Sequence, residues 1–234
     1  MSVSNEDSMR RTKDEAAQTR ENILDAAEAM FFEKGVAGTT LSQIASHSGL
    51  TRGAIYWHFE NKLAVFRAMQ DRARLPQEEF FKKSDRDHPP SIGELYDKTI
   101  EALEFLKSDM RAQRVLTILN FRCEYVGEMQ PALHRRDCAD DAMRLEIERI
   151  FAHALSREGP LSREGPMAGN RDPQALATAY FCCVGGLITN WLRTEGSFDL
   201  VDVGRRLLRA IVADHVETCR SRLPGNPSGR VPRP

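Results

Sequence analysis

The 234-residue sequence has almost no net charge, few cysteines and no long apolar run. Its 33 Lys and Arg residues nearly balance 34 Asp and Glu residues, which excludes a globally basic nucleic-acid coat protein but allows a local binding face. The 5 cysteines lack the paired spacing of a zinc or thioredoxin-like centre, so we expect reduced, mostly buried thiols. No stretch approaches about 18 consecutive apolar residues, and the N-terminus is too polar for a secretory signal. We therefore expect a cytoplasmic protein without membrane contact.

The sequence also lacks the motifs of common enzyme classes. It contains no H-E-x-x-H, no G-x-S-x-G, no G-x-x-x-x-G-K-[ST] and no G-x-G-x-x-G after a strand pattern. Its 6 histidines show no metal-ligand spacing. We expect no enzymatic activity, no cofactor and no metal site.

Helical periodicity fills the sequence instead. Apolar residues recur at steps of three and four, and no alternating run is long enough for a strand. The pattern predicts an all-α fold with a short helix after Thr40 and further helices at residues 12–34, 52–58, 61–83, 92–106, 110–125, 129–155, 172–193 and 198–222. Pro76 is expected to kink or end the helix 61–83, and residues 85–90 to form a linker. Residues 155–166, a tandem repeat of Leu-Ser-Arg-Glu-Gly-Pro, are predicted to be a lengthened loop.

Two short helices near the N-terminus have the spacing of a helix-turn-helix. Thr40 and Gln43 have the form of a capping box that starts the first, Gly49 suits the left-handed residue after its end, and Thr51 caps the second. The second helix has a core side and a side rich in Arg, Tyr, Trp and His. This arrangement is typical of a unit whose second helix enters the DNA major groove. Many helical proteins that never touch DNA share the spacing, so on spacing alone both interpretations stay open.

The side chains of the second helix suit DNA chemically. The planar fork of Arg52 matches the O6 and N7 acceptors of guanine, and Gly53 permits close approach to the groove. Hydroxyl, imidazole and ammonium groups nearby are expected to meet the sugar-phosphate backbone. Tyr56 and Trp57 have the alternative role of half-buried packing residues. The candidate DNA-binding residues are Thr40, Ser42, Thr51, Arg52, Gly53, Tyr56, Trp57, His58 and Lys62.

A specific series of motifs runs through this part of the chain. The motifs are Ile23-Leu24-Asp25-Ala26-Ala27-Glu28, Phe31-Phe32, Lys34-Gly35-Val36, Thr39-Thr40-Leu41, Ile44-Ala45, Gly49-Leu50-Thr51-Arg52-Gly53-Ala54-Ile55-Tyr56-Trp57-His58-Phe59 and Asn61-Lys62. The series, from about residue 12 to 66, resembles the DNA-binding domain of the tetracycline-repressor (TetR) family. With Arg11-Thr12-Lys13 before the first helix, it is similar to the drug-responsive AcrR and TtgR type that controls multidrug efflux pumps. Weaker similarity extends through Cys123-Glu124, Gly186-Leu187-Ile188 and Trp191-Leu192.

The resemblance implies an N-terminal three-helix helix-turn-helix domain at residues 12–66. A C-terminal helical ligand-binding and dimerisation domain at residues 67–222 and a disordered tail at residues 223–234 would follow. The implied function is that of a repressor that binds a palindromic operator in double-stranded DNA as a homodimer. A small apolar or aromatic effector would release it, and a multidrug efflux operon would be its target. A sensor of an endogenous metabolite, or an activator, is the alternative.

The effector pocket is expected among the helices that begin near residues 61, 92, 110 and 172. Its candidate residues, each of which has the alternative of being ordinary core, are Phe66, Met69, Leu106, Thr117, Phe121, Phe181, Val184 and Ile188. Gly185 stands where relatives in the subgroup can carry an acidic residue, so the resemblance leaves the effector undefined. The helix 61–83 is expected to be the one element that belongs to both domains and to act as the lever between them.

Two apolar stripes near the C-terminus favour a dimer interface formed by residues 172–222. One consists of Leu176, Tyr180, Cys183, Leu187 and Trp191, and the other of Val203, Leu207, Ile211 and His215. Two such hairpins would make a four-helix interface. The alternative is that both stripes close the core of a single chain.

Overall fold

The computed structural model describes residues 3–72, 89–157 and 172–220, with side chains described for residues 13–72, 89–156 and 172–212. The helices are α1 (Val3–Lys34), α2 (Leu41–His47), α3 (Arg52–His58), α4 (Lys62–Arg72), α6 (Ile92–Ser108), α7 (Met110–Phe121), α8 (Gln130–Arg157), α9 (Pro173–Arg193) and α10 (Leu200–Arg220). One turn of 3-10 helix, Gly127–Met129, precedes α8. The predicted all-α fold is confirmed, and the described residues contain no strand. Pro76, the tail 223–234 and most of the linker and tandem repeat lie outside the described residues.

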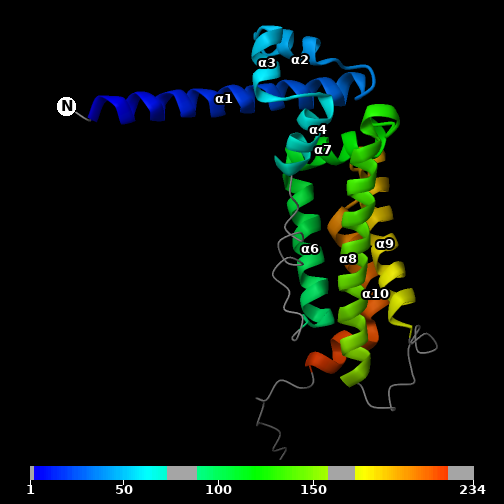
Figure 1. Ribbon diagram of the computed structural model, residues 1–234. Helices are drawn as coiled ribbons and strands as arrows, with labels where there is room; N and C mark the ends of the chain where they lie inside the picture. The colour runs from blue at the N-terminus through cyan, green and yellow to red at the C-terminus, as the bar shows by residue number, and fades with distance from the viewer. Residues whose placement is uncertain (1–2, 73–88, 158–171, 221–234) are drawn as a thin grey trace, which may run out of the picture.

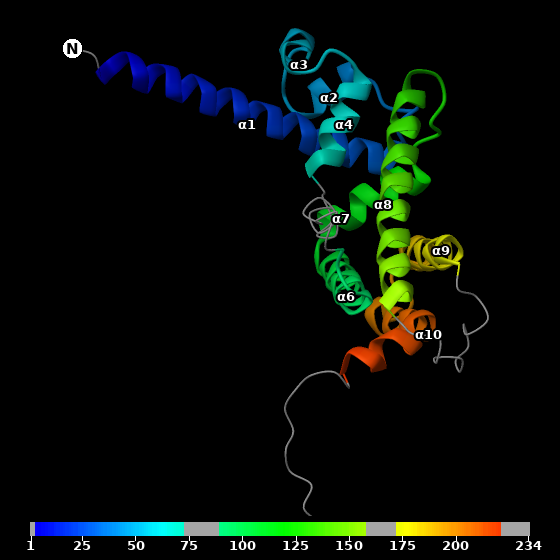
Figure 2. The same cartoon turned by 60° about the horizontal axis from the view of Figure 1, so that its bottom comes forward.

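The helices form two parts. Residues 3–72, which we call the head, contain α1 to α4, and residues 89–220, the body, contain α6 to α10 (Figure 1). In the body, α8 packs against α9, and α10 packs against α6 and α9. Helix α7 lies where the head meets the body, and the first turns of α1 extend away from both parts (Figure 2). The head therefore presents α2 and α3 at one end of the molecule.

Two hydrophobic cores correspond to these parts, but the boundary between them is not simple. The head core includes four side chains from the body: Val115, Ile118, Met129 and Ala132. The prediction that the helix starting near residue 61 is the one shared element is therefore wrong. Helix α7 and the start of α8 complete the core of the head as well.

The ends of the short helices follow the local signals in the sequence. The Thr40 hydroxyl accepts a hydrogen bond from the backbone N–H of Gln43, whose side chain accepts from the backbone of Thr40. Gly49 has a φ of 71° and Thr51 caps α3, both as predicted. The predicted helix 110–125 ends earlier, at Phe121, because the chain turns over the head core and Tyr125 takes a positive φ of 51°.

The apolar stripe predicted for the dimer interface on α9 lies inside the chain. Leu176, Tyr180, Leu187 and Trp191 are buried in the body core, and Cys183 is half-buried. Their assignment to the interface is wrong because α8 and α10 cover this side of α9. On α10 the stripe is only partly covered, since Leu207 is 42% exposed.

The four cysteines with described side chains are free thiols, as expected. The expectation that most cysteines are buried is wrong for these four, because Cys138 and Cys182 lie on exposed sides of their helices and Cys123 and Cys183 are only half-buried. Burial raises the pKa of the Cys123 and Cys183 thiols, which keeps both protonated at neutral pH.

Candidate DNA-binding interface and effector site

The helix-turn-helix formed by α2 and α3, which we call the reading unit, packs on the rest of the head through one buried face of each short helix. Leu41, Ile44 and Ala45 of α2 and Ile55 of α3 are buried against α1 and each other. Thr51 caps α3 by accepting from the backbone N–H of Ala54 at 3.2 Å. The opposite faces are thereby left to solvent in a fixed orientation.

The exposed face of α3 carries large side chains with little intramolecular support. Trp57 is 72% exposed, so the alternative of a half-buried packing residue does not describe it. Tyr56 is 45% exposed, with its ring partly covered by Arg52. The Arg52 guanidinium lies 5.7 Å from the centre of the Tyr56 ring and belongs to no ion pair within the described residues. Covering an exposed aromatic pair beside an Arg with another molecule is favourable, so this surface is suited to binding.

His58 lies at the inner edge of this face. Its ring packs edge-on against Trp57, with ring centres 4.6 Å apart. Burial, and then the nearby positive charge of Arg20, lower the pKa of His58 below its usual range. The imidazole is therefore neutral at pH 7 and can donate one hydrogen bond to a phosphate or a base.

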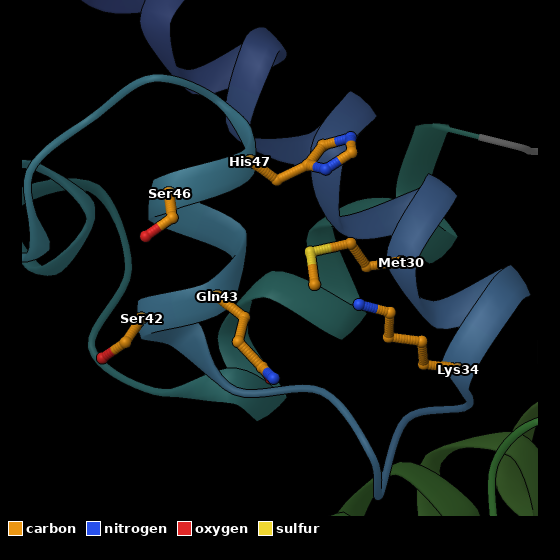
Figure 3. Close-up of a pocket in the computed structure, with 6 residues that line it drawn as sticks. All are labelled: Met30, Lys34, Ser42, Gln43, Ser46 and His47. Atoms are coloured by element: carbon orange, nitrogen blue, oxygen red, sulfur yellow. The ribbon is translucent and has the colours of Figure 1, made fainter.

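A shallow hollow lies beside α2, between its exposed face and the end of α1. Figure 3 shows the Lys34 ammonium and the Gln43 amide nitrogen directed toward it. Gln43 uses its side-chain oxygen for the cap on Thr40, which leaves the amide N–H groups as donors. The residues that line the hollow are Met30, Lys34, Ser42, Gln43, Ser46 and His47. No acidic side chain is among them, so the lining suits an anion such as a phosphate.

Lys62, predicted to meet the DNA backbone, has a different environment. Its ammonium donates to the carbonyl oxygens of Val36 at 2.9 Å and Thr39 at 3.1 Å. It also pairs with a Glu128 carboxylate oxygen at 3.0 Å, and its side chain is only 12% exposed. In this conformation the ammonium is used within the protein.

The predicted effector-pocket residues fall into separate groups. Phe66 and Met69 are fully buried in the head core, where Phe66 packs edge-on against Phe31 and Tyr125. Leu106 is buried in the body core. Thr117 donates its hydroxyl to the Gln113 carbonyl, and Phe121 is 39% exposed.

The remaining three pocket candidates lie together on the body side. Phe181, Val184 and Ile188 are half-buried against the body core, as is Tyr96. The Tyr96 hydroxyl is buried and has no hydrogen-bond partner among the residues that the structure describes. A buried phenol without a partner costs free energy unless something bonds to it. Tyr96 carries no distinguishing signal in the sequence, because an unsatisfied hydroxyl is visible only once its neighbours are known.

An exposed two-helix reading unit fixed to a helical body defines a DNA-binding transcriptional regulator. Residues 23–69 match bacterial regulatory proteins of the tetR family, and residues 91–215 match the C-terminal region of MAATS-type transcriptional repressors. The chain belongs to the TetR family of bacterial regulators, as its motifs predict.

Individual relatives are similar over most of the chain. The HTH-type transcriptional repressor BepR of Brucella suis biovar 1 (strain 1330) is 43% identical over 205 residues, which cover 87% of this chain and 95% of BepR. The crystal structure of NalD, the secondary repressor of the MexAB-OprM multidrug efflux pump in Pseudomonas aeruginosa, is similar to this chain, with 35% identity and a TM-score of 0.71. The matched region covers 85% of this chain and 96% of NalD. The complex of SmeT, from Stenotrophomonas maltophilia, with triclosan has 29% identity and a TM-score of 0.70, covering 92% and 100%.

Proposed function

We propose that the chain is a ligand-responsive repressor that binds a palindromic operator as a homodimer and controls a multidrug efflux operon. The observation that carries the DNA-binding part is the exposed, unpaired face of α3 with Arg52, Tyr56 and Trp57. Control of an efflux operon is supported by the similarity to NalD, which is a repressor of such a pump. In this role the protein acts in the cytoplasm, as a regulator and not as an enzyme.

Each DNA-contacting side chain has a proposed role. Arg52 reads guanine in the major groove, and Gly53 allows close approach. The Tyr56 hydroxyl and the His58 imidazole contact the sugar-phosphate backbone beside the exposed Trp57. Thr40, Ser42 and Thr51 meet phosphates, since the first helix of such a unit crosses the backbone. The hollow beside α2, with the Lys34 ammonium directed toward it, extends this phosphate-contacting surface.

The dimer is proposed to form through residues 172–222, but through a different face of α9 from the predicted stripe. Helix α9 has an 18-residue window of mean hydropathy 1.4, of which only 28% is buried, enough in length and composition for a membrane span. Its uncovered face consists largely of small side chains, and a Cβ added at Gly185 or Gly186 meets nothing within 4 Å. Such a face allows a second helix to approach closely, and Leu207 of α10 adds apolar area beside it.

A charged residue introduced on the uncovered face of α9 should prevent dimer formation if that face is the interface. We expect the wild-type protein to have twice the 26.4 kDa chain mass by light scattering, and Gly186→Arg to have the mass of one chain. Because the site is open in the single chain, the helical circular-dichroism signal of Gly186→Arg should be retained. A folded Gly186→Arg dimer would place the interface elsewhere.

The effector is proposed to be a small aromatic molecule that binds in the body near Phe181, Val184 and Ile188. The unpartnered Tyr96 hydroxyl is the proposed polar anchor, because a phenolic ligand would supply the hydrogen bond it lacks. The SmeT structure contains triclosan, a chlorinated phenol, which makes triclosan a suitable first probe.

Operator release tests the function as a whole. A DNA site is first selected by the protein from a random pool, and we expect a palindrome. Arg52→Ala should lose about 1–3 kcal/mol for this site while binding random DNA almost normally. Triclosan should dissociate the complex in a gel shift and bind less tightly, by calorimetry, when DNA is present, because coupling between two ligands is reciprocal. Binding of triclosan that leaves the DNA complex intact would favour a sensor of another metabolite or an activator.

A further inference from the structure

The Lys62 ammonium lies where the head and body meet. Lys62 is the first residue of α4, directly after the reading unit, and its three N–H donors have three partners: the Val36 and Thr39 carbonyls and Glu128. Glu128 belongs to the 3-10 turn of the body. One cation of the head is thus paired with one anion of the body.

A second contact holds the body segment in the same place. The backbone N–H of Val36 donates to the carbonyl of Arg122 at 2.8 Å, so residues 122–128 are docked on the loop between α1 and α2. That loop ends at Thr40, the cap of the helix expected to cross the DNA backbone. The Lys62 ammonium therefore lies next to the proposed phosphate-contacting surface, bonded to the carbonyl of Thr39, the residue before this cap.

The three partners of Lys62 belong to different parts of the molecule. The two carbonyls belong to the loop of the head, the part that also contains Lys62 itself. Glu128 is 57% exposed and belongs to the body. A carboxylate and a phosphate are interchangeable partners for an ammonium, since Lys binds either as a point charge. A phosphate at the start of α2 and the carboxylate of Glu128 would thus compete for the same charge.

We propose that Glu128 is a built-in competitor for operator phosphate: it pairs with Lys62 in the docked state of residues 122–128 and yields the ammonium to the DNA backbone when the operator binds. Glu128 acts through Lys62 and is a positioning residue that touches no DNA. The inference rests on the proposed operator binding. It makes part of the DNA affinity depend on a body segment, and gives the body a route to weaken DNA binding.

The test compares two charge-neutralising variants on the same segment. Glu128→Gln removes the competing anion, whereas Glu124→Gln removes another exposed acidic residue for which no ion pair is found among the described residues. We expect Glu128→Gln to tighten operator binding about two- to fivefold, the range of one exposed ion pair. The slope of log K against log salt should be steeper than in the wild type by less than one, because salt weakens the competing Lys62–Glu128 pair only in the wild type, whereas Lys62 contacts phosphate in both proteins. Glu124→Gln, which changes net charge equally, should alter affinity less than twofold and leave the slope unchanged.

A double-mutant cycle shows whether Lys62 carries the effect. In a Lys62→Gln background, Glu128→Gln should act no more than Glu124→Gln does, because the ammonium for which phosphate competes is absent. Circular dichroism verifies that each variant is folded. Equal effects of Glu128→Gln and Glu124→Gln, or an effect that persists without Lys62, would overturn the inference. Failure of the wild-type protein to select any operator would instead contradict the proposed function.

Discussion

The buried carboxylate of Glu28 makes the head–body junction sensitive to one arginine. Glu28 of α1 is 2% exposed, and its partners come from α7: Arg114 at 3.0 Å and Arg111 at 3.6 Å. One of its oxygens has no hydrogen bond. Arg111 is also shared with Asp25 at 3.1 Å, so it cannot fully replace Arg114.

Replacing Arg114 by Ala leaves this carboxylate without its best partner. Removing one side of a fully buried pair costs about 3–5 kcal/mol. Here Arg114 is 42% exposed and Arg111 remains, so we expect a smaller loss of about 1.5–3 kcal/mol. For a chain of this size that corresponds to a fall in Tm of about 3–10 °C, measured by circular dichroism at fixed protein concentration.

Arg144→Ala is the matched control. Arg144 is also 42% exposed and pairs at 2.7 Å, but its partner Asp141 is 61% exposed, so its loss should cost at most about 0.5 kcal/mol. Adding Glu28→Gln to Arg114→Ala should recover part of the stability, because the buried charge is then gone. Equal Tm values for the two arginine variants would refute the reasoning that burial of the partner determines the cost.

Three further outcomes follow from single contacts. Gly204→Ala should lower the free energy of unfolding by about 1–3 kcal/mol, since the new Cβ would lie 2.5 Å from Leu103 Cδ1. Gly93→Ala should be nearly neutral, because its new Cβ would meet only a side-chain oxygen at 3.8 Å. Urea unfolding compares the two variants. Tyr180→Phe should cost about 1 kcal/mol in the same assay, because the buried hydroxyl bonds to the Thr99 hydroxyl at 2.7 Å. The pKa of His58 is lowered by burial, and then by Arg20, so the folded protein favours the neutral imidazole. The stability that this preference contributes is therefore complete above the ordinary pKa of about 6.5 and is lost as the pH falls below that value. His58→Gln should therefore show a weaker loss of stability between pH 7 and 5 than the wild type.

The features predicted correctly are those determined by neighbouring residues. The cap formed by Thr40 and Gln43 involves residues three apart, and the positive φ at Gly49 needs only the absence of a side chain. The end of α7 was not predictable in this way. It depends on the contact of Tyr125 with Phe66, more than fifty residues earlier in the chain.

The stripe on α9 illustrates a more general difficulty. A helix packed on one side and uncovered on the other can have apolar or small residues on both faces, and periodicity identifies the larger ones. Those larger side chains, such as Tyr180 and Trp191, fill the core of the chain itself. The small ones, Gly185 and Gly186, leave open space that only the coordinates reveal.

The candidate DNA-binding residues also differ in how far their environment depends on residues distant in the sequence. Arg52 and Trp57 were identified by type and spacing, and both lie exposed on α3. Lys62 has the right type and spacing too, but its partner Glu128 is 66 positions away, so the ion pair could not be predicted from the local sequence. Tyr96 was missed for a related reason, because its importance lies in a hydrogen bond it lacks.

The breadth of the junction between head and body limits how an effector can act. Helix α4 is held to α8 by Asp71 and Arg135 at 2.7 Å, α1 is held to α7 through Glu28, and the head core contains body side chains. Because the junction is held at several places, we expect it to repack between two arrangements when the proposed effector binds, and not to move as one hinged lever. Under the proposed function, an effector releases DNA only to the extent that it binds one arrangement better than the other. A tenfold change in affinity needs about 1.4 kcal/mol, which the exchange of two exposed ion pairs, at about 0.2–1 kcal/mol each, can supply at the upper end of their range. Modest differences in effector contacts within the body are therefore sufficient to change the affinity of the head for its operator.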